Sequence, residues 1–599
     1  MFSDIVYKKI LNYCLVEARD LSLVGVYSKR NALWDNILYV ISLSLVCKRW
    51  AMKVIPCLCY PSFKIKNAAE CGMYLKYQTY GITQPQSVSQ APTYPPIEIN
   101  SIDLYNLFGI GDKLLDQIYN NTLYSSQIRS IHFANQGAFE YEDDSGTPLI
   151  MSLNSTVGKE KFVQNVANIQ SLEFSIRSQG DVHLIQYILE NNTSLTSVRL
   201  SILFEGTYPL GKMLSSHPSL KTVYLQQILY DKMPHALPVA GNHLETIEFS
   251  NFNFRDNSTL TLIDLIQQSE NLTKIYLNGV SINRLMIGNL LEALAHNTRI
   301  KEFTFTHNES INASQRQILS LLATNKTMTR FEMTFDVYDA EKDQGQSPQT
   351  FTETQHTPSS FETLRLSSRI DLDTLPLACT SSITKLVLYH IPAISTLETH
   401  FQNVSTLELD YCDYTDTSQV CETICLLGKG TLLPNLVSLR LGVSADEWTW
   451  RQFFSNLSIH NRTLHTLAIP KVIQYDILTS FIRSNHPTIS SLLIWAQGTS
   501  TPILHLVDNT SITNLHLSLK SYFGDEAFDL LLQLLVKPTL KHLYYNVHIK
   551  KFDTLKLNQA LKVTQLESFE PPSGITKHNP TLNNILKFKS ILPYNDIFK

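Results

Sequence analysis

Few stretches of this 599-residue sequence bring together residue types that could do chemistry. The first is SLVCKRWA (44–51), in which Cys47 stands beside Lys48 and Arg49 and shortly before Trp50. Neighbouring cations lower the pKa of a thiol, so Cys47 could be an activated nucleophile. The same residues could instead form a metal site, a nucleic-acid contact or one face of a docking helix, and the surrounding sequence must discriminate among these four.

The pattern around this stretch favours the docking helix. Leu43, Cys47, Trp50 and Val54 recur at helical spacing, and Pro56 ends the helix. Cys47 and Trp50 are therefore expected to be apolar packing residues, with the two basic residues between them on the wetter side. The same periodicity earlier in the chain predicts that residues 1–60 form a small helical module.

No other cluster supports metal or catalytic chemistry. Cys57 and Cys59 form an isolated C-x-C, and Cys421 and Cys425 lie one helical turn apart without a second ligand pair at zinc spacing. The sequence contains no phosphate-binding loop, no dinucleotide-binding glycine motif, no G-x-S-x-G and no HExxH. We therefore expect no enzymatic activity, no cofactor, no bound metal, and reduced thiols that are mostly buried.

Composition and charge exclude further classes. The net charge of −4 leaves no basic field that could hold a phosphate backbone, so nucleic-acid binding is not expected. A hydrophobic content of 43% with 17% charged residues is typical of a folded chain. There is neither a run of about 18 apolar residues nor a signal-peptide pattern. We expect no membrane association and a location in the cytoplasm, with the nucleus as the alternative.

A repeated strand motif organises most of the chain. The pattern apolar-x-x-apolar-x-apolar recurs at intervals of mostly about 21–28 residues. The alternation that ends each copy predicts a short strand, and segments of helical period separate the copies. Examples of the strand motif are LTSVRL (195–200), LETIEF (244–249), LTKIYL (272–277), LVSLRL (436–441), ITNLHL (512–517) and LKHLYY (540–545).

This pattern resembles the leucine-rich-repeat family, in its longer, helix-containing subtype. One strand–turn–helix unit cannot bury its own apolar face, whereas stacked units form a parallel sheet that helices cover on one side. The resemblance implies an α/β leucine-rich-repeat solenoid over residues 125–570, with about 16–17 divergent copies and helices on the convex side of a curved sheet. A polar insertion at 339–360 is expected to be a surface loop, or alternatively a regulatory segment with phosphorylation sites.

The ends of the chain differ from the repeats. Residues 61–124, which include the Pro- and Gln-rich stretch 84–96, are expected to form a linker and the N-terminal cap of the solenoid. Residues 571–599 are expected to form a C-terminal cap or tail.

The N-terminal module resembles an F-box. DIVYKKILNYC (4–14) and ISLSLVCKRWAMKVI (41–55) correspond to the two halves of the F-box motif. Together with the repeats, this resemblance implies an F-box and leucine-rich-repeat protein that acts as a non-enzymatic adaptor. The module would bind a Skp1-type linker protein of a cullin-containing ubiquitin ligase, and the repeats would bind a protein substrate. The residues matched to the motif are Ile5, Ile10, Leu11, Leu45, Val46, Cys47 and Trp50.

A second interpretation stays open. The usual Leu-Pro opening of the motif is missing, and the segment 16–36 lengthens the gap between its halves. The chain could therefore be a leucine-rich-repeat scaffold or regulator that binds a protein without any ligase.

Substrate contacts are expected on the concave face of the sheet. Strand side chains alternate, so residues that flank the third apolar position of each copy point to that face. Aromatic residues and Arg are the usual hot spots of protein interfaces. The candidates are Tyr224, Tyr276, Arg365, Tyr389, Glu408, Arg440, Trp495, His516 and Tyr544.

Several N-x-S/T sequons fall where a helix meets the next strand, among them Asn192, Asn271, Asn325 and Asn461. Asn tolerates the left-handed backbone conformation that ends many helices. We therefore expect these asparagines to be turn residues rather than glycan carriers.

Overall fold

The computed structural model describes residues 63–65, 99–103, 130–133 and, with internal gaps, 169–571; the longest gap is 335–359. The chain divides into two compact units, Met1–Met286 and Ile287–Lys599. The helical module expected at 1–60 lies outside the described residues, as do its F-box-like residues Ile5, Ile10, Leu11, Leu45, Val46, Cys47 and Trp50. The expected insertion at 339–360 also lies outside them, apart from Ser360.

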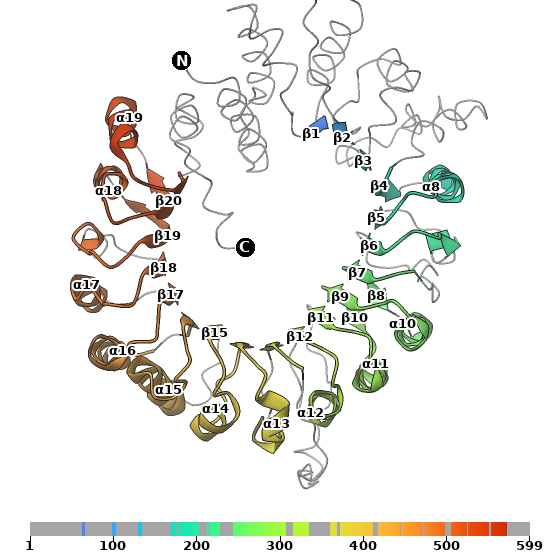
Figure 1. Ribbon diagram of the computed structural model, residues 1–599, viewed down its shortest axis with the longest axis horizontal. Helices are drawn as coiled ribbons and strands as arrows, with labels where there is room; N and C mark the ends of the chain where they lie inside the picture. Colours follow the sequence, from blue (N-terminus) through green and yellow to red (C-terminus); the bar gives the residue numbers. More distant parts are fainter. Residues whose placement is uncertain are drawn as a thin grey trace, which may run out of the picture. The chain divides into compact units, whose positions relative to one another are not determined.

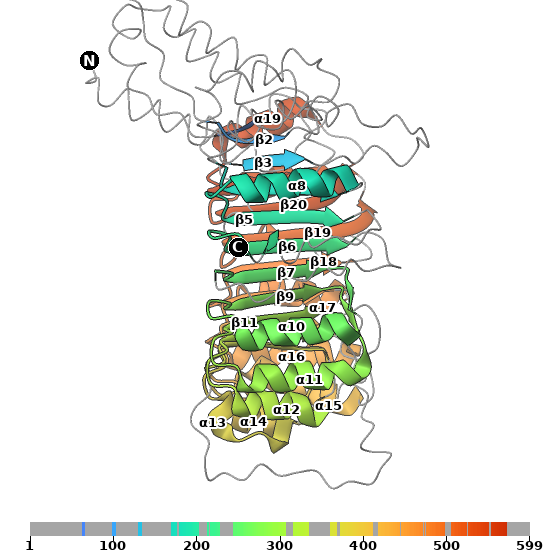
Figure 2. The ribbon, with the colours of Figure 1, turned by 90° about the vertical axis from the view of Figure 1, so that its right-hand side faces the viewer.

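The first unit contains a parallel sheet whose strands pair in chain order (Figure 2). Its helices pack on one side of the sheet, and β8 (Asn253–Phe254) and β10 (Ser281–Ile282) form a separate small parallel pair. The strands are β1 (Phe63–Ile65), β2 (Ile99–Asp103), β3 (Ser130–Phe133), β4 (Ser171–Ile176), β5 (Ser197–Ile202), β6 (Thr222–Gln227), β7 (Thr246–Ser250) and β9 (Lys274–Asn278). The helices are α8 (Gln179–Asn191) and α10 (Asp256–Gln268), and α11 (Arg284–His296) crosses the division between the units.

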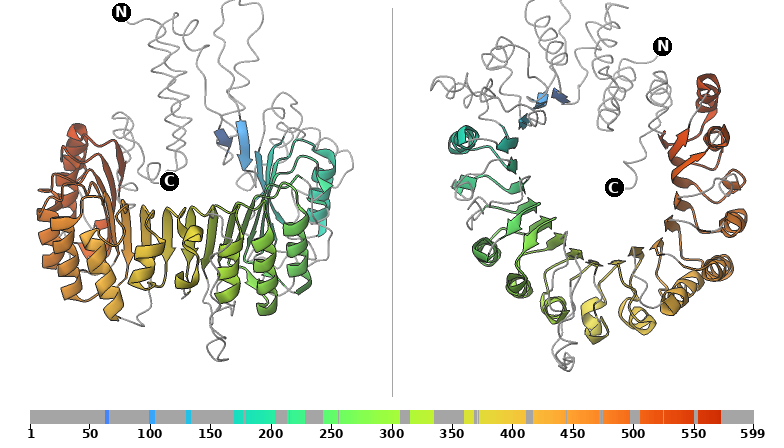
Figure 3. Two further views of the ribbon diagram at one scale, coloured as in Figure 1. Left: turned by 60° about the horizontal axis from the view of Figure 1, so that its bottom comes forward. Right: turned by 180° about the vertical axis from the view of Figure 1, so that it is seen from behind.

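The second unit repeats the same arrangement: strands line the inner face of an arc and helices cover the outer face (Figures 1 and 3). Each strand pairs in parallel with the next one in the chain. The strands are β11 (Glu302–Thr306), β12 (Arg330–Thr334), β13 (Thr363–Leu366), β14 (Lys385–Leu388), β15 (Thr406–Asp410), β16 (Ser438–Gly442), β17 (Thr466–Pro470), β18 (Ser491–Ala496), β19 (Asn514–Phe523), β20 (His542–Ile549) and β21 (Ser568–Glu570).

The helices of the second unit vary in length more than its strands do. They are α12 (Gln315–Thr324), the 3₁₀ turn η6 (Leu372–Thr374), α13 (Leu377–Thr380), α14 (Ile394–His400), α15 (Thr417–Lys429), α16 (Glu447–His460), α17 (Tyr475–Arg483), α18 (Asp525–Leu535) and α19 (Thr554–Val563). The short α13 and α14 belong to the copies with the closest motif spacing, since the motifs at 361, 383 and 404 succeed one another by about 21–22 residues.

The repeated motif builds the core because its apolar positions alternate along each strand. In β6, Val223 and Leu225 are buried, whereas Thr222 and Tyr224, which alternate with them, are partly exposed. The strand register stacks equivalent apolar residues of successive copies, such as Val223 on Ile247. Full burial of each such side chain contributes about 1.5–3 kcal/mol. Each unit therefore has the α/β solenoid arrangement that the sequence predicts, a parallel sheet of repeated strands with helices on one side.

Asparagines at the helix-to-strand joints stabilise this stacking. Asn325 is 1% exposed, and its Nδ2 donates hydrogen bonds to the Leu294 and Asn297 carbonyls at 2.7 and 2.9 Å. Its Oδ1 accepts from the backbone N–H groups of Thr327 and Met328. The side chain thus ties its own turn to the preceding repeat. Asn192, Asn461 and Asn509 make the corresponding bonds.

Asn192, Asn325 and Asn461 are turn residues, as expected, but they do not have the left-handed backbone conformation that was expected of them. Among the described residues, the non-glycine residues with positive φ are Asn251 and Asn485, and neither is a buried joint asparagine. The joint is specified by hydrogen bonds to otherwise unpaired backbone groups. His486 replaces Asn at one joint with the same pattern of bonds. Asn271 does not share this position, because it is exposed.

Candidate functional site

The partly exposed strand side chains form rows across the sheet face that the helices leave uncovered. In the second unit, the register places Glu332, Arg365, Val387, Glu408 and Arg440 side by side on β12–β16. We call this face of β12–β21 the strand surface. It contains a charged group on β12–β16 and an aromatic group on β18–β20.

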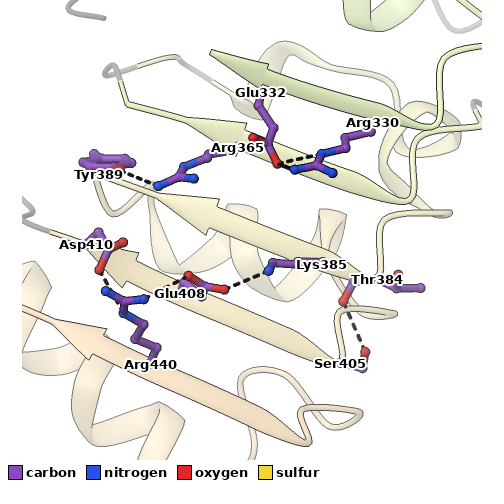
Figure 4. Close-up of polar contacts among 10 residues, drawn as sticks. All are labelled: Arg330, Glu332, Arg365, Thr384, Lys385, Tyr389, Ser405, Glu408, Asp410 and Arg440. Carbon is purple, nitrogen blue, oxygen red and sulfur yellow. Dashed lines mark hydrogen bonds and ion pairs between the residues drawn. The ribbon is translucent and has the colours of Figure 1, made fainter. Parts of the chain in front are cut away.

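The centre of the charged group is Glu408, which lies between two cations (Figure 4). Lys385 Nζ is 2.9 Å from Glu408 Oε1, and Arg440 Nη1 is 3.7 Å from Glu408 Oε2. Arg440 also places Nε 3.3 Å from Asp410 Oδ1, without the alignment of a hydrogen bond, so this is a charge contact. Three neighbouring strands therefore supply one ion network.

Two further pairs extend the charged group (Figure 4). Arg365 Nη2 donates a hydrogen bond to Tyr389 Oη at 2.8 Å, and Arg330 donates from Nε to Glu332 Oε1 at 2.9 Å. Desolvation opposes the charge of Arg365, but the hydrogen bond to Tyr389 and the nearby carboxylates outweigh it and raise the pKa of Arg365. Arg365 is therefore charged at neutral pH.

The aromatic group is a stack across three strands. The rings of His516 and Tyr544 lie 4.0 Å apart, almost parallel, and Trp495 packs 5.2 Å from His516 at an angle of 53°. The guanidinium carbon of Arg440 is 5.2 Å from the Trp495 ring centroid, which joins the charged and aromatic groups. Burial lowers the pKa of His516 to about 4, so its imidazole is neutral at pH 7.

Glu570 on β21 ends the aromatic row, because it lies in register with Tyr544. Its Oε2 is buried without a hydrogen-bond partner. Burial raises the pKa of this carboxyl. Burial, and then the charge of Glu570, raise the pKa of Tyr544 as well.

The first unit has a corresponding row. Arg199, Tyr224, Glu248 and Tyr276 lie side by side on β5, β6, β7 and β9. The Arg199 guanidinium carbon is 4.1 Å from the Tyr224 ring centroid. Asn278 donates a hydrogen bond to Glu248 Oε1 at 2.8 Å. The row of the first unit thus alternates charged and aromatic side chains.

The structure places all nine residues predicted from the sequence on the sheet face opposite the helices, and seven of them lie in the second unit. Those seven fall into three contacting sets: Arg365 with Tyr389, Glu408 with Arg440, and Trp495 with His516 and Tyr544. Sequence reasoning missed Arg330 and Lys385, which contribute two cations. Strand alternation could have found both, since each lies two residues before a position on the same face.

Neither metal chemistry nor an activated thiol has support in the described part of the chain. No group of three or more His, Cys, Asp or Glu residues there is placed to hold a metal ion. Burial raises the pKa of Cys425 on α15, which opposes formation of a thiolate. Cys47 lies outside the described residues. Of the described helices, none combines the length and apolar character that a bilayer crossing requires.

Comparisons with known proteins identify no relative by sequence: neither a family model nor a curated protein matches the chain. Among solved structures, it is similar to the Toll–Spatzle complex of Drosophila, which is described as a hub in development and innate immunity. That match has 13% sequence identity and a TM-score of 0.33, and it covers 82% of this chain and 55% of the other. The chain thus spans little more than half of that structure's length.

Proposed function

We propose that this protein is a non-enzymatic adaptor that captures a protein substrate on its strand surface and presents it to a Skp1–cullin-type ubiquitin ligase. The observation that carries the capture step is the strand surface itself, where Arg, Tyr, Trp and His side chains from neighbouring repeats contact one another. A leucine-rich-repeat arrangement with such a surface favours protein binding.

The residue types explain why this surface suits a protein ligand. Tyr, Trp and Arg dominate interface hot spots. Tyr and Trp bury large areas with few rotatable bonds, and the planar guanidinium of Arg supplies several directed hydrogen-bond donors. Mutual contacts fix the side chains before a partner arrives, which lowers the entropy cost of binding. A stable interface buries about 800 Å² on each partner, and a surface that spans many strands can provide such an area.

The connection to a ligase rests on the F-box-like sequences at 4–14 and 41–55. The mechanism would be proximity: joining a substrate-binding module to a ligase-binding module raises the effective concentration of substrate lysines near the transfer enzyme. Such an adaptor would act in the cytoplasm or nucleus.

The alternative is a repeat scaffold or regulator without a ligase, which the long gap 16–36 in the F-box-like motif favours. Binding of the full-length chain to a purified Skp1-type protein separates the two functions. The adaptor predicts a complex at micromolar concentration that Leu45→Asp or Trp50→Asp abolishes, whereas Trp448→Asp on α16 leaves it intact. No complex with the folded full-length chain would leave the scaffold as the function.

A further inference from the structure

In the charged group, the cationic side chains are more exposed to solvent than the carboxylates that pair with them. Side chains of Arg330 and Lys385 are 45% exposed and that of Arg440 is 41% exposed. Their partners are deeper: the exposed fractions are 11% for Glu332, 20% for Glu408 and 8% for Asp410. A molecule that approaches this part of the surface therefore meets positive charge first.

The net charge of the strands that carry this group is also positive. Strands β12–β16 carry four cations, the three above and Arg365, against three carboxylates, so their net charge is +1. The chain as a whole has a net charge of −4. The charged group is thus a local cationic surface on an acidic protein.

The deeper carboxylates fix the cations in place, so this surface is specific rather than simply basic. Each exposed cation is held by a carboxylate below it, as Lys385 is by Glu408 (Figure 4). Held in this way, the cations offer hydrogen bonds in fixed directions and lose little side-chain entropy when a ligand binds. A net charge of +1 is too small to attract a phosphate backbone through counterion release, which requires many unpaired cations.

We infer that this surface binds an acidic segment of the protein ligand, whose carboxylates pair with Arg330, Lys385 and Arg440. The inference rests on the proposed capture of a protein substrate and names the chemistry of that substrate.

The aromatic group predicts a second feature of the ligand, next to its acidic residues. Arg440 contacts Trp495, so a ligand carboxylate at Arg440 brings the neighbouring ligand side chains over the aromatic stack. From Arg440 on β16 to Trp495 on β18 the surface spans two strand steps, or roughly 10 Å, which an extended peptide covers in about three residues. The segment should therefore be acidic at one end and carry an aromatic or aliphatic side chain about three residues beyond the carboxylate that pairs with Arg440.

A displayed library of random twelve-residue peptides tests this inference. It is selected in parallel on the full-length chain, on the double variant Arg330→Glu/Lys385→Glu, and on the control Lys429→Glu/Lys562→Glu, which makes the same charge change at exposed positions of α15 and α19. The wild type and the control should enrich Asp- and Glu-containing peptides. The double variant should bind those peptides at least about tenfold more weakly.

Two further variants test one cation and the aromatic group separately. Lys385→Gln removes one cation without adding a carboxylate beside Glu408 and should lose about threefold in affinity for the enriched peptides. Trp495→Ala tests the aromatic group. Thermal unfolding by circular dichroism identifies any variant that fails to fold, which is then replaced by its Gln counterpart.

The outcomes separate the two levels of the proposal. Enriched peptides that lose binding with Trp495→Ala but show no excess of acidic residues would overturn the inference and leave protein capture standing. If no enriched peptide loses affinity for the Trp495→Ala variant or for the Arg330→Glu/Lys385→Glu variant, that result would contradict protein capture by this surface as well. Tighter binding of a single-stranded oligodeoxythymidine than of the acidic peptides would also overturn the inference.

Discussion

Single asparagines at the joints between repeats specify both the local turn and its attachment to the preceding repeat. Asn461 is buried, its Nδ2 donates to the Leu427 carbonyl, and its Oδ1 accepts from the Thr463 and Leu464 backbone N–H groups. An N-linked glycan would need that same Nδ2 to be accessible. The geometry therefore explains why sequons recur in the sequence without serving as glycan sites at these joints.

Replacing Asn461 by Ala should lower the free energy of unfolding by roughly 2–4 kcal/mol, because buried backbone donors and a carbonyl lose their partner. Urea unfolding measures the change. The matched control is Asn271→Ala, a sequon residue with an exposed side chain, which should change the free energy by about 0.5 kcal/mol or less. Equal effects of the two substitutions would contradict the structural role of the buried asparagines.

The low pKa of His516 predicts a dependence of stability on pH. The folded-state pKa is about 4 because burial disfavours the charged imidazolium, whereas the unfolded value is about 6.5. Between these values the unfolded chain binds the proton more readily, so stability falls as the pH drops from about 6.5 to 4.

Comparing the wild type with His516→Gln isolates this contribution. The difference in unfolding free energy between pH 7 and pH 4.5 should be smaller in the variant, by at most about 3 kcal/mol. Other histidines with lowered pKa, such as His486, are present in both proteins and cancel. An identical pH dependence would show that His516 is not desolvated.

At the scale of helices and strands, the sequence predicts the repeated units well because each strand motif is short, regular and copied many times. The register of β12–β16 then results from stacking equivalent apolar positions. The sequence does not, however, predict the depth of each side chain. Val387 occupies the same row as Arg365 and Glu408 yet is buried, and only contacts between neighbouring repeats determine this.

Close helix packing is a second feature that motif spacing does not predict. A Cβ atom at Gly428 on α15 would lie 2.7 Å from the Phe453 carbonyl oxygen and 3.0 Å from the Phe453 ring, both on α16. The absence of a side chain lets α15 and α16 approach each other. No periodic pattern marks this glycine, since the contact depends on the neighbouring repeat.

Gly428→Ala should therefore destabilise the protein by about 1–3 kcal/mol, although alanine favours helix more than glycine does. Chemical unfolding measures the effect, and Glu422→Ala at an exposed position of the same helix is the control. Stabilisation by Gly428→Ala would mean that helix propensity outweighs packing and that the two helices are not in close contact.

At the scale of the whole molecule, the proposed protein capture depends on which face of the sheet the helices of each unit leave uncovered. Helices cover the outer face of the second unit (Figure 1), and the strand surface carries the Arg365–Tyr389 pair (Figure 4) and the ring stack of Trp495, His516 and Tyr544. The sequence predicted this division and most of the surface residues. It could not predict that the cations are more exposed than the carboxylates paired with them, because residue type alone does not determine exposure.

Site-specific photo-cross-linking in cells tests the central claim, protein capture by the strand surface, most directly. A photoreactive phenylalanine analogue replaces Tyr389 on the strand surface or, as the control, Trp448 on α16, whose side chain is 62% exposed on the helical face. We predict discrete protein adducts from position 389 that disappear when Trp495→Ala and Arg440→Gln are added, and no such adducts from position 448. Adducts that form equally from both positions, or that persist in the doubly substituted protein, would contradict capture by this surface.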